Sequence, residues 1–212
     1  MGERGGHRSG SYRRGKAPAM FRRMPFPEPG PRVPRRGGPL RAALGRAILR
    51  LLGWQLEGAL PDRAKFVVSA APHSSNWDFI IGIALLFVLR LDVRWVGKAE
   101  LFRGPLKPLM RWLGGIPVRR DQPQGFVAQL VAEFARREAL VLALAPEGTR
   151  RPVERWKSGF YRVALEAGVP IVPGYFDNAR KRVGFGPEYW PKGDAQADIT
   201  ELRRFYERFA RR

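Results

Sequence analysis

A histidine and an aspartate lie five positions apart in the chain, at His73 and Asp78, directly before a long apolar run. Residues 146–150 read Pro-Glu-Gly-Thr-Arg and follow a second apolar run. An imidazole has an unperturbed pKa of about 6.5, so it can accept a proton near neutral pH. A carboxylate beside it would fix its tautomer and stabilise the imidazolium. The two segments together predict general-base chemistry on a hydroxyl that lies close to an anion.

The spacing of His73 and Asp78 restricts where each can lie. On one continuous helix, five residues turn a side chain by about 140°, so the two groups would point apart. They can meet only if His73 lies in a loop and Asp78 in the first turn of a helix that starts after Ser75. Ser75 and Asp78 also have the spacing of a capping box. The alternative is therefore that Asp78 only accepts hydrogen bonds from backbone amides and that His73 is an ordinary loop residue.

The Pro-Glu-Gly-Thr-Arg segment follows a predicted strand, and sites of α/β sheets gather at the carboxyl ends of strands. Gly148 permits a sharp turn, and Arg150 offers a planar donor group suited to phosphate. Lys98 and Arg120 follow two other predicted strands. Basic groups from three strand ends could surround one anion, although each alone is typical of a solvated surface. There is no cysteine and no Gly-x-Ser-x-Gly segment, so the predicted base would act on a substrate hydroxyl.

Apolar periodicity alternates along the chain between strands and helices. This alternation predicts a single α/β domain with a mixed, mostly parallel central sheet flanked by helices. The predicted strands are 65–70, 93–97, 116–118, 139–145, 169–176 and 181–185, and the predicted helices are 39–54, 76–91, 105–113, 124–139, 157–167 and a final one around 199–209.

The first part of the chain differs in composition from the rest. Residues 1–38 hold eight glycines, six prolines and ten basic residues against two acids, which predicts a disordered basic arm before a domain at 39–212. Residues 39–57 are expected to form an amphipathic, membrane-facing helix. A helix docked on the core is the alternative, and both could hold for different parts of its apolar side. That side contains Leu40, Leu44, Ala47, Ile48 and Leu51.

The chain of 212 residues has a formal net charge of +20, which favours an anionic partner, either a membrane surface or nucleic acid. With no cysteine and two histidines, no metal site is expected. The longest apolar run, 79–89, is far shorter than the roughly 18–20 residues that span a bilayer. No signal peptide is recognised either, so any membrane attachment is expected to be peripheral, at the cytoplasmic face of the inner (plasma) membrane.

Four blocks in this order resemble the glycerolipid (lysophospholipid) acyltransferase family, whose bacterial members include 1-acyl-glycerol-phosphate acyltransferases. The similarity runs from about residue 73 to residue 173. The blocks are His73 with Asp78; Gly97, Lys98, Glu100 and Leu101 leading to Gly114, Ile116, Val118 and Arg120; Pro146 to Arg150 followed by Trp156, Lys157 and Gly159; and the segment 169–173.

The resemblance implies an O-acyltransferase that moves an acyl group from acyl-CoA or acyl carrier protein to a lysophospholipid hydroxyl, without a further cofactor. His73 would be the general base and Asp78 its partner, and the acceptor would be bound by Lys98, Arg120, Glu147, Gly148, Thr149 and Arg150. Pro72 and Arg119 depart from residues frequent in the family, and the extra positive charge should favour a more anionic headgroup.

Two other kinds of function remain open from the sequence. The acceptor could be a glycolipid or an aminolipid, or the chain could bind nucleic acid or another anionic surface. Against nucleic acid, no recognition motif is found and aromatic residues are not interleaved with basic ones. A non-catalytic member of the family is a further alternative, against which the intact histidine–aspartate and Glu-Gly-Thr-Arg blocks argue.

Overall fold

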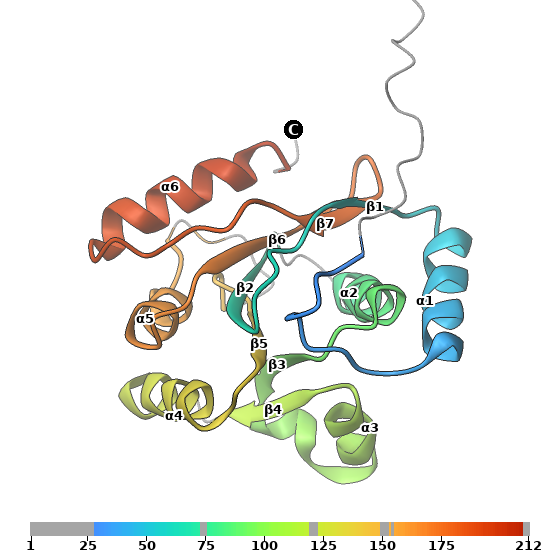
Figure 1. The fold of residues 1–212 in the computed structure, drawn as a ribbon, viewed down its shortest axis with the longest axis horizontal. Helices are drawn as coiled ribbons and strands as arrows, with labels where there is room; N and C mark the ends of the chain where they lie inside the picture. The colour runs from blue at the N-terminus through green and yellow to red at the C-terminus, as the bar shows by residue number, and fades with distance from the viewer. Residues whose placement is uncertain (1–27, 73–75, 119–122, 149–152, 154, 210–212) are drawn as a thin grey trace, which may run out of the picture.

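The computed structural model describes residues 28–72, 76–118, 123–148, 153 and 155–209. Seven described strands form one sheet in the order β1-β7-β6-β2-β5-β3-β4, and helices cover both faces (Figure 1). The strands are β1 (Gln55–Gly58), β2 (Lys65–Ala71), β3 (Val93–Lys98), β4 (Gly115–Val118), β5 (Leu140–Leu144), β6 (Ile171–Asp177) and β7 (Arg182–Phe185). The helices are α1 (Pro39–Leu51), α2 (Asn76–Leu89), α3 (Lys107–Trp112), α4 (Pro123–Arg136), α5 (Gly159–Glu166) and α6 (Ala195–Glu207), with short 3₁₀ helices η1 (Ala99–Phe102) and η2 (Gly104–Leu106).

The predicted α/β architecture with a mostly parallel sheet is confirmed. Strands β6, β2, β5, β3 and β4 run parallel to one another. Strand β7 is antiparallel to β6, and β1 is parallel to β7. A chain that alternates strands with helices favours this arrangement, because each parallel connection must cross a face of the sheet.

Successive residues of β2 face opposite sides of the sheet, and both sides are buried. Phe66 and Val68 join the core under α1 and α2, whereas Val67 joins the core under α4, α5 and α6. A strand buried on both faces needs a continuous apolar run rather than an alternating one. This is why β2 and β5 stand out so clearly in the sequence.

Two boundaries differ from the sequence prediction. The predicted arm at 1–38 is too long at its end, because Val33 is 1% exposed and Arg36 donates its backbone N–H to the carbonyl of Arg90 at 2.8 Å. The predicted helix at 39–57 is also too long: α1 ends at Leu51, and residues Gln55–Gly58 form the edge strand β1. Residues 1–27 lie outside the described part of the chain.

Helix α1 docks on α2 through a side that the apolar pattern did not predict. Its buried residues are Ala42, Gly45 and Leu49. A Cβ on Gly45 would come within 2.6 Å of the carbonyl oxygen of Ala84, so the small residues allow a close approach of the two helices. Of the predicted apolar side, Ile48 is half-buried, whereas Leu40 and Leu51 are 85% and 88% exposed.

Helix α2 is apolar along nearly its whole length, and most of it is buried between the sheet and α1 (Figure 1). Its first turn is the exception, with Trp77 59% and Ile80 40% exposed. Among the described residues, no helix has the length and apolarity needed to pass through a bilayer.

Candidate active site

The predicted site segments follow four neighbouring strands at one edge of the sheet. In the parallel register, Ser69 of β2 lies opposite Leu144 of β5, and Lys98 of β3 lies opposite Val118 of β4. Strands β3 and β5 pair in the same direction. The carboxyl ends of β2, β5, β3 and β4 therefore share one edge of the sheet. In the chain, His73, the 146–150 segment and Arg120 come directly after three of these ends, and Lys98 is the last residue of β3.

Several predicted residues fall outside the described part of the chain. These are His73, Arg120, Thr149 and Arg150, together with the side chain of Lys98. Their roles stay predictions. Asp78, Glu147 and Gly148 are described, and the common sheet edge of the strand ends fits the predicted convergence.

Asp78 lies where the sequence places it, in the first turn of a helix. Helix α2 begins at Asn76, so Asp78 is its third residue, and it is 1% exposed. The backbone N–H groups and the dipole at a helix N-terminus stabilise a carboxylate in this position. A buried acid directly after the loop that contains His73 is suited to orient an imidazole, although the pairing of the two side chains remains a prediction.

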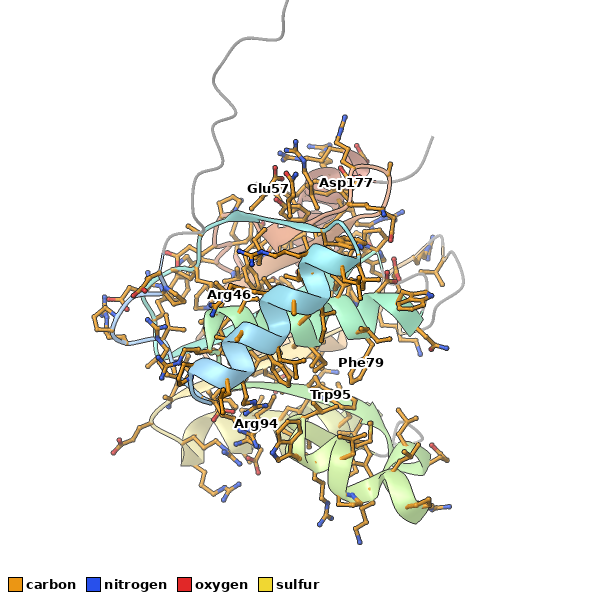
Figure 2. The ribbon with its side chains drawn as sticks, turned by 90° about the vertical axis from the view of Figure 1, so that its right-hand side faces the viewer. Arg46, Glu57, Phe79, Arg94, Trp95 and Asp177 are labelled. Carbon is orange, nitrogen blue, oxygen red and sulfur yellow. The ribbon has the colours of Figure 1, made fainter. Side chains whose placement is uncertain are left out.

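Aromatic packing fixes the first turn of α2 over the end of the sheet. Phe79, the neighbour of Asp78, meets Trp95 of β3 edge to face with ring centroids 4.9 Å apart (Figure 2). Trp95 in turn donates its indole N–H to the carbonyl of Leu113 at 3.0 Å and packs on Phe102, with centroids 5.8 Å apart. These contacts connect the helix that carries Asp78 to strand β3, which ends at Lys98.

The turn after β5 places Gly148 in the left-handed region, in agreement with the prediction that this glycine permits a sharp turn. Gly148 has a φ of 65° and donates its N–H to the carbonyl of Ala145 at 3.1 Å. A Cβ at this position would lie 2.9 Å from Cδ of Lys157, so any larger residue would combine backbone strain with a clash. The backbone N–H of Lys157 donates to the carbonyl of Pro146 at 2.9 Å. Lys157 thus lies against the predicted acceptor-binding turn, although it was not among the predicted site residues.

Tyr206 of α6 contacts the same region through Ser69 of β2. Its buried hydroxyl lies 2.7 Å from Oγ of Ser69 on β2 and also donates to the backbone carbonyl of Ser69. Its ring meets Trp156 edge to face at 5.1 Å. Burial raises the pKa of the Tyr206 hydroxyl, and the charge of Glu147 acts in the same direction. Tyr206 was not among the predicted site residues, because it lies at the far end of the chain, in a helix recognised only by its apolar face.

The comparisons with known proteins agree with this arrangement. A model of the Acyltransferase family matches residues 57–177, more than half of the chain. Over 153 residues the chain is 29% identical to the 1-acyl-sn-glycerol-3-phosphate acyltransferase of Escherichia coli (strain K12), which covers 68% of this chain and 60% of that protein. The enzyme of the same name from Haemophilus influenzae is 24% identical over 160 residues, covering 71% of this chain and 65% of that protein.

A solved structure shares the fold. The crystal structure of the 1-acyl-sn-glycerophosphate (LPA) acyltransferase PlsC from Thermotoga maritima matches with a TM-score of 0.56 and 18% identity, covering 82% of this chain and 80% of that one. The chain spans less than two thirds of the length of the two relatives above. The matched segment 57–177 contains every predicted site residue and all five parallel strands. The chain belongs to the Acyltransferase family.

Proposed function

We propose that this protein transfers a fatty acyl group from an acyl thioester to the free hydroxyl of a lysophospholipid such as 1-acyl-glycerol-3-phosphate. The observation that carries the proposal is the shared edge of the sheet, where the segments with the family's residues follow β2, β5, β3 and β4. Asp78 is buried at this edge in the first turn of α2. The names of the two bacterial relatives, both 1-acyl-sn-glycerol-3-phosphate acyltransferases, support the choice of a phosphate-bearing glycerol acceptor.

In the proposed reaction, His73 accepts the proton of the lipid hydroxyl while the oxygen attacks the thioester carbonyl. The carbon–sulfur bond then breaks, and the thiolate leaves with the proton that His73 returns. Asp78 holds the imidazole and offsets its positive charge. General-base catalysis of this kind contributes about 10²–10⁴ in rate, and positioning of the two substrates must supply much of the rest.

The remaining predicted residues would bind the acceptor. Arg120 and Arg150 would hold its phosphate, and Lys98, Glu147, Gly148 and Thr149 would line the same subsite. Lys157 supports this reading, since its side chain lies against Gly148. The donor would be acyl-CoA or acyl carrier protein, and the chain itself would need no cofactor.

We further propose that the enzyme works on an anionic membrane surface, attached peripherally at the cytoplasmic face of the inner membrane. Helix α1 supports this proposal because it exposes Leu40, Leu44 and Leu51 on one side, and it also exposes Arg46 and Arg50. Leucines on one side and arginines beside them are typical of helices that lie in a bilayer interface.

The deciding experiment supplies purified protein with mixed lysolipids and, in separate reactions, acyl-CoA or acylated acyl carrier protein, and it identifies the products by mass spectrometry. We expect a diacyl phospholipid as the main product. An acylated glycolipid or aminolipid instead would replace the acceptor in the proposal, and no acylated lipid with either donor would overturn it.

The role of His73 is tested by His73→Ala. We expect this change to abolish acyl transfer while leaving circular dichroism and thermal unfolding unchanged, because the imidazole is the only proposed base. Wild-type rates from the variant would exclude that role.

A further inference from the structure

A second segment besides α1 exposes large apolar side chains on the same layer of the molecule. In the 101–112 segment, Leu106 is 57%, Leu109 45% and Trp112 49% exposed. These three residues follow one another at intervals of three, so they share one side of the η2–α3 segment. Single exposed leucines are ordinary on protein surfaces, but a contiguous stripe marks an interaction surface.

The charges in this segment have one sign. Arg103, Lys107 and Arg111 are exposed, and residues 103–112 contain no acid. None of the three forms an ion pair with a residue in the described ranges of the chain. The segment therefore offers apolar side chains and positive charge together, and residues 103–112 contain no acid that could neutralise this charge.

Arg41 joins this segment to α1. Its guanidinium carbon lies 4.4 Å from the ring centroid of Phe87 on α2 and 4.4 Å from that of Trp112 on α3. The rings of Phe87 and Trp112 also meet edge to face at 6.0 Å. Cation–π contacts from one guanidinium to both rings hold α1, α2 and α3 together. In Figure 2, which looks at this layer, α1 crosses in front of α2, and α3 lies lower in the view on the same side of the sheet.

We propose that the η2–α3 segment is a second membrane-docking element, which contacts an anionic lipid bilayer together with α1. Leucines interleaved with exposed basic residues match a surface that is polyanionic outside and apolar beneath. Trp112 is suited to the boundary between the two, where tryptophan is enriched. A protein partner with acidic residues would account for the charge but not for the exposed leucines on both η2–α3 and α1.

The η2–α3 segment lies close in the chain to the candidate active site, so docking through it would also position that site relative to the bilayer. It begins a few residues after Lys98, the last residue of β3 at the carboxyl edge of the sheet. Docking through η2 and α3 therefore brings the bilayer to the edge where the acceptor-binding segments meet. This consequence rests on the proposed function, whereas the docking itself is measurable without any activity.

The first test changes apolar area and leaves the charge constant. The full chain carrying Leu106→Ser and Leu109→Ser is compared with the wild type for binding to vesicles of phosphatidylcholine and phosphatidylglycerol in equal parts. Removing two interfacial leucines should weaken binding about tenfold. Leu165→Ser is the matched control, because Leu165 is 40% exposed on α5 in the opposite layer and should bind as the wild type does.

The second test changes the charge and leaves the leucines in place. Lys107→Gln with Arg111→Gln should weaken binding by roughly fivefold for each lost charge. The control is Arg162→Gln with Arg204→Gln, which removes two charges from α5 and α6. The basic arm is present in all variants, so its contribution to binding is constant.

The proposal would be overturned if each variant bound the vesicles as tightly as its control variant does. It would also be overturned by a change from oligomer to monomer in the leucine variant without vesicles, because the segment would then contact a second copy of the chain. Activity separates this proposal from the proposed function. If both hold, the leucine variant keeps its rate on dispersed monomeric lysolipid and loses rate only on vesicle-bound acceptor.

Discussion

The two helical layers of the sheet show different surfaces to solvent. Helices α1 and α3 contain five basic residues, Arg41, Arg46, Arg50, Lys107 and Arg111, and no acid. In the opposite layer, acids and bases are mixed and pair within helices, as in Arg162 with Glu166 at 3.2 Å. The α1–α3 layer also holds most of the large apolar side chains that are exposed.

This contrast distinguishes apolar side chains that the fold buries from exposed apolar side chains that folding does not require. The apolar faces of α4, α5 and α6 are accounted for by burial against the sheet, since Leu130, Phe160, Val163 and Leu202 are all in one core. Leu40, Leu106 and Leu109 contribute nothing comparable to the core. A surface that folding does not require is the better candidate for binding.

Two buried aspartates give the sharpest comparison between the layers. Asp78 and Asp198 are 1% and 2% exposed, and each lies in the first turn of a helix. Asp198 accepts hydrogen bonds from Tyr161 at 2.6 Å, Tyr189 at 2.7 Å and the backbone N–H of Lys192 at 2.6 Å. These contacts tie α6 to α5 and to the loop that precedes α6.

The largest expected effect is that of Asp78→Asn on catalysis. An amide in place of the carboxylate would no longer stabilise the imidazolium of His73, so kcat should fall by about 10²–10⁴. Steady-state kinetics with acyl-CoA measures this, and thermal unfolding should change little. A variant with normal kcat would remove Asp78 from the reaction and leave it a helix-terminus residue.

Asp198→Asn should show the opposite behaviour. Its amide cannot accept three donors in the same geometry, so the free energy of unfolding should fall by about 3 kcal/mol. Chemical denaturation measures the change, and kcat at a temperature where the variant is folded should stay near the wild-type value. If kcat fell as strongly as in Asp78→Asn, the two layers would not be functionally distinct.

The same aspartate predicts a pH dependence of stability. Burial raises the pKa of Asp198, but the hydrogen bonds from Tyr161, Lys192 and Tyr189 outweigh it and hold the pKa below its ordinary value. A lowered folded-state pKa contributes stability above the unfolded value of about 3.9, and that stability is lost as the pH falls below it. Wild type should therefore lose stability more steeply than Asp198→Asn between about pH 4 and pH 2. Parallel acid-denaturation curves would contradict this.

Gly45→Ala tests how α1 is held on its layer. The new Cβ would lie 2.6 Å from the carbonyl oxygen of Ala84, which should cost about 1–3 kcal/mol by forcing the helices apart. Gly38→Ala is the control, because a Cβ there has no neighbour within 4 Å. Differential scanning calorimetry compares the two. Equal melting temperatures would mean that α1 shifts without cost and is not fixed by close packing.

The smallest expected effect compares two tyrosine hydroxyls that hold α6. Tyr206→Phe and Tyr161→Phe each remove one buried hydroxyl and should each lower stability by about 1 kcal/mol. Only Tyr206 touches Ser69 and Trp156, which lead to the predicted base and to the acceptor-binding turn. A several-fold lower kcat should therefore occur in Tyr206→Phe alone. An equal loss in both variants would attribute it to general loosening of α6.

Much of the architecture could be read from apolar periodicity. The strands under both helical layers are buried on two sides, and so β5 appears as an unbroken apolar run at 140–144 and β2 as a mostly apolar one at 65–71. Strand β1 was missed because Gln55–Gly58 contains only one leucine and therefore shows no apolar pattern. The segment is a strand because it pairs with β7. Residues 28–38 were assigned to the arm because their glycines and prolines resemble disorder, although tertiary contacts bury Val33.

For the site, the sequence by itself determined the residue types, their order and their position after strands, because a parallel sheet brings successive carboxyl ends to one edge. It also placed Asp78 in the first turn of α2. Only the tertiary structure decided that the Lys157 side chain lies against Gly148, that Tyr206 joins this region and that α1 turns its leucines outward. Periodicity ranks residues by apolarity, whereas docking of α1 on α2 depends on how closely two backbones approach, and there Gly45 and Ala42 outweigh larger leucines.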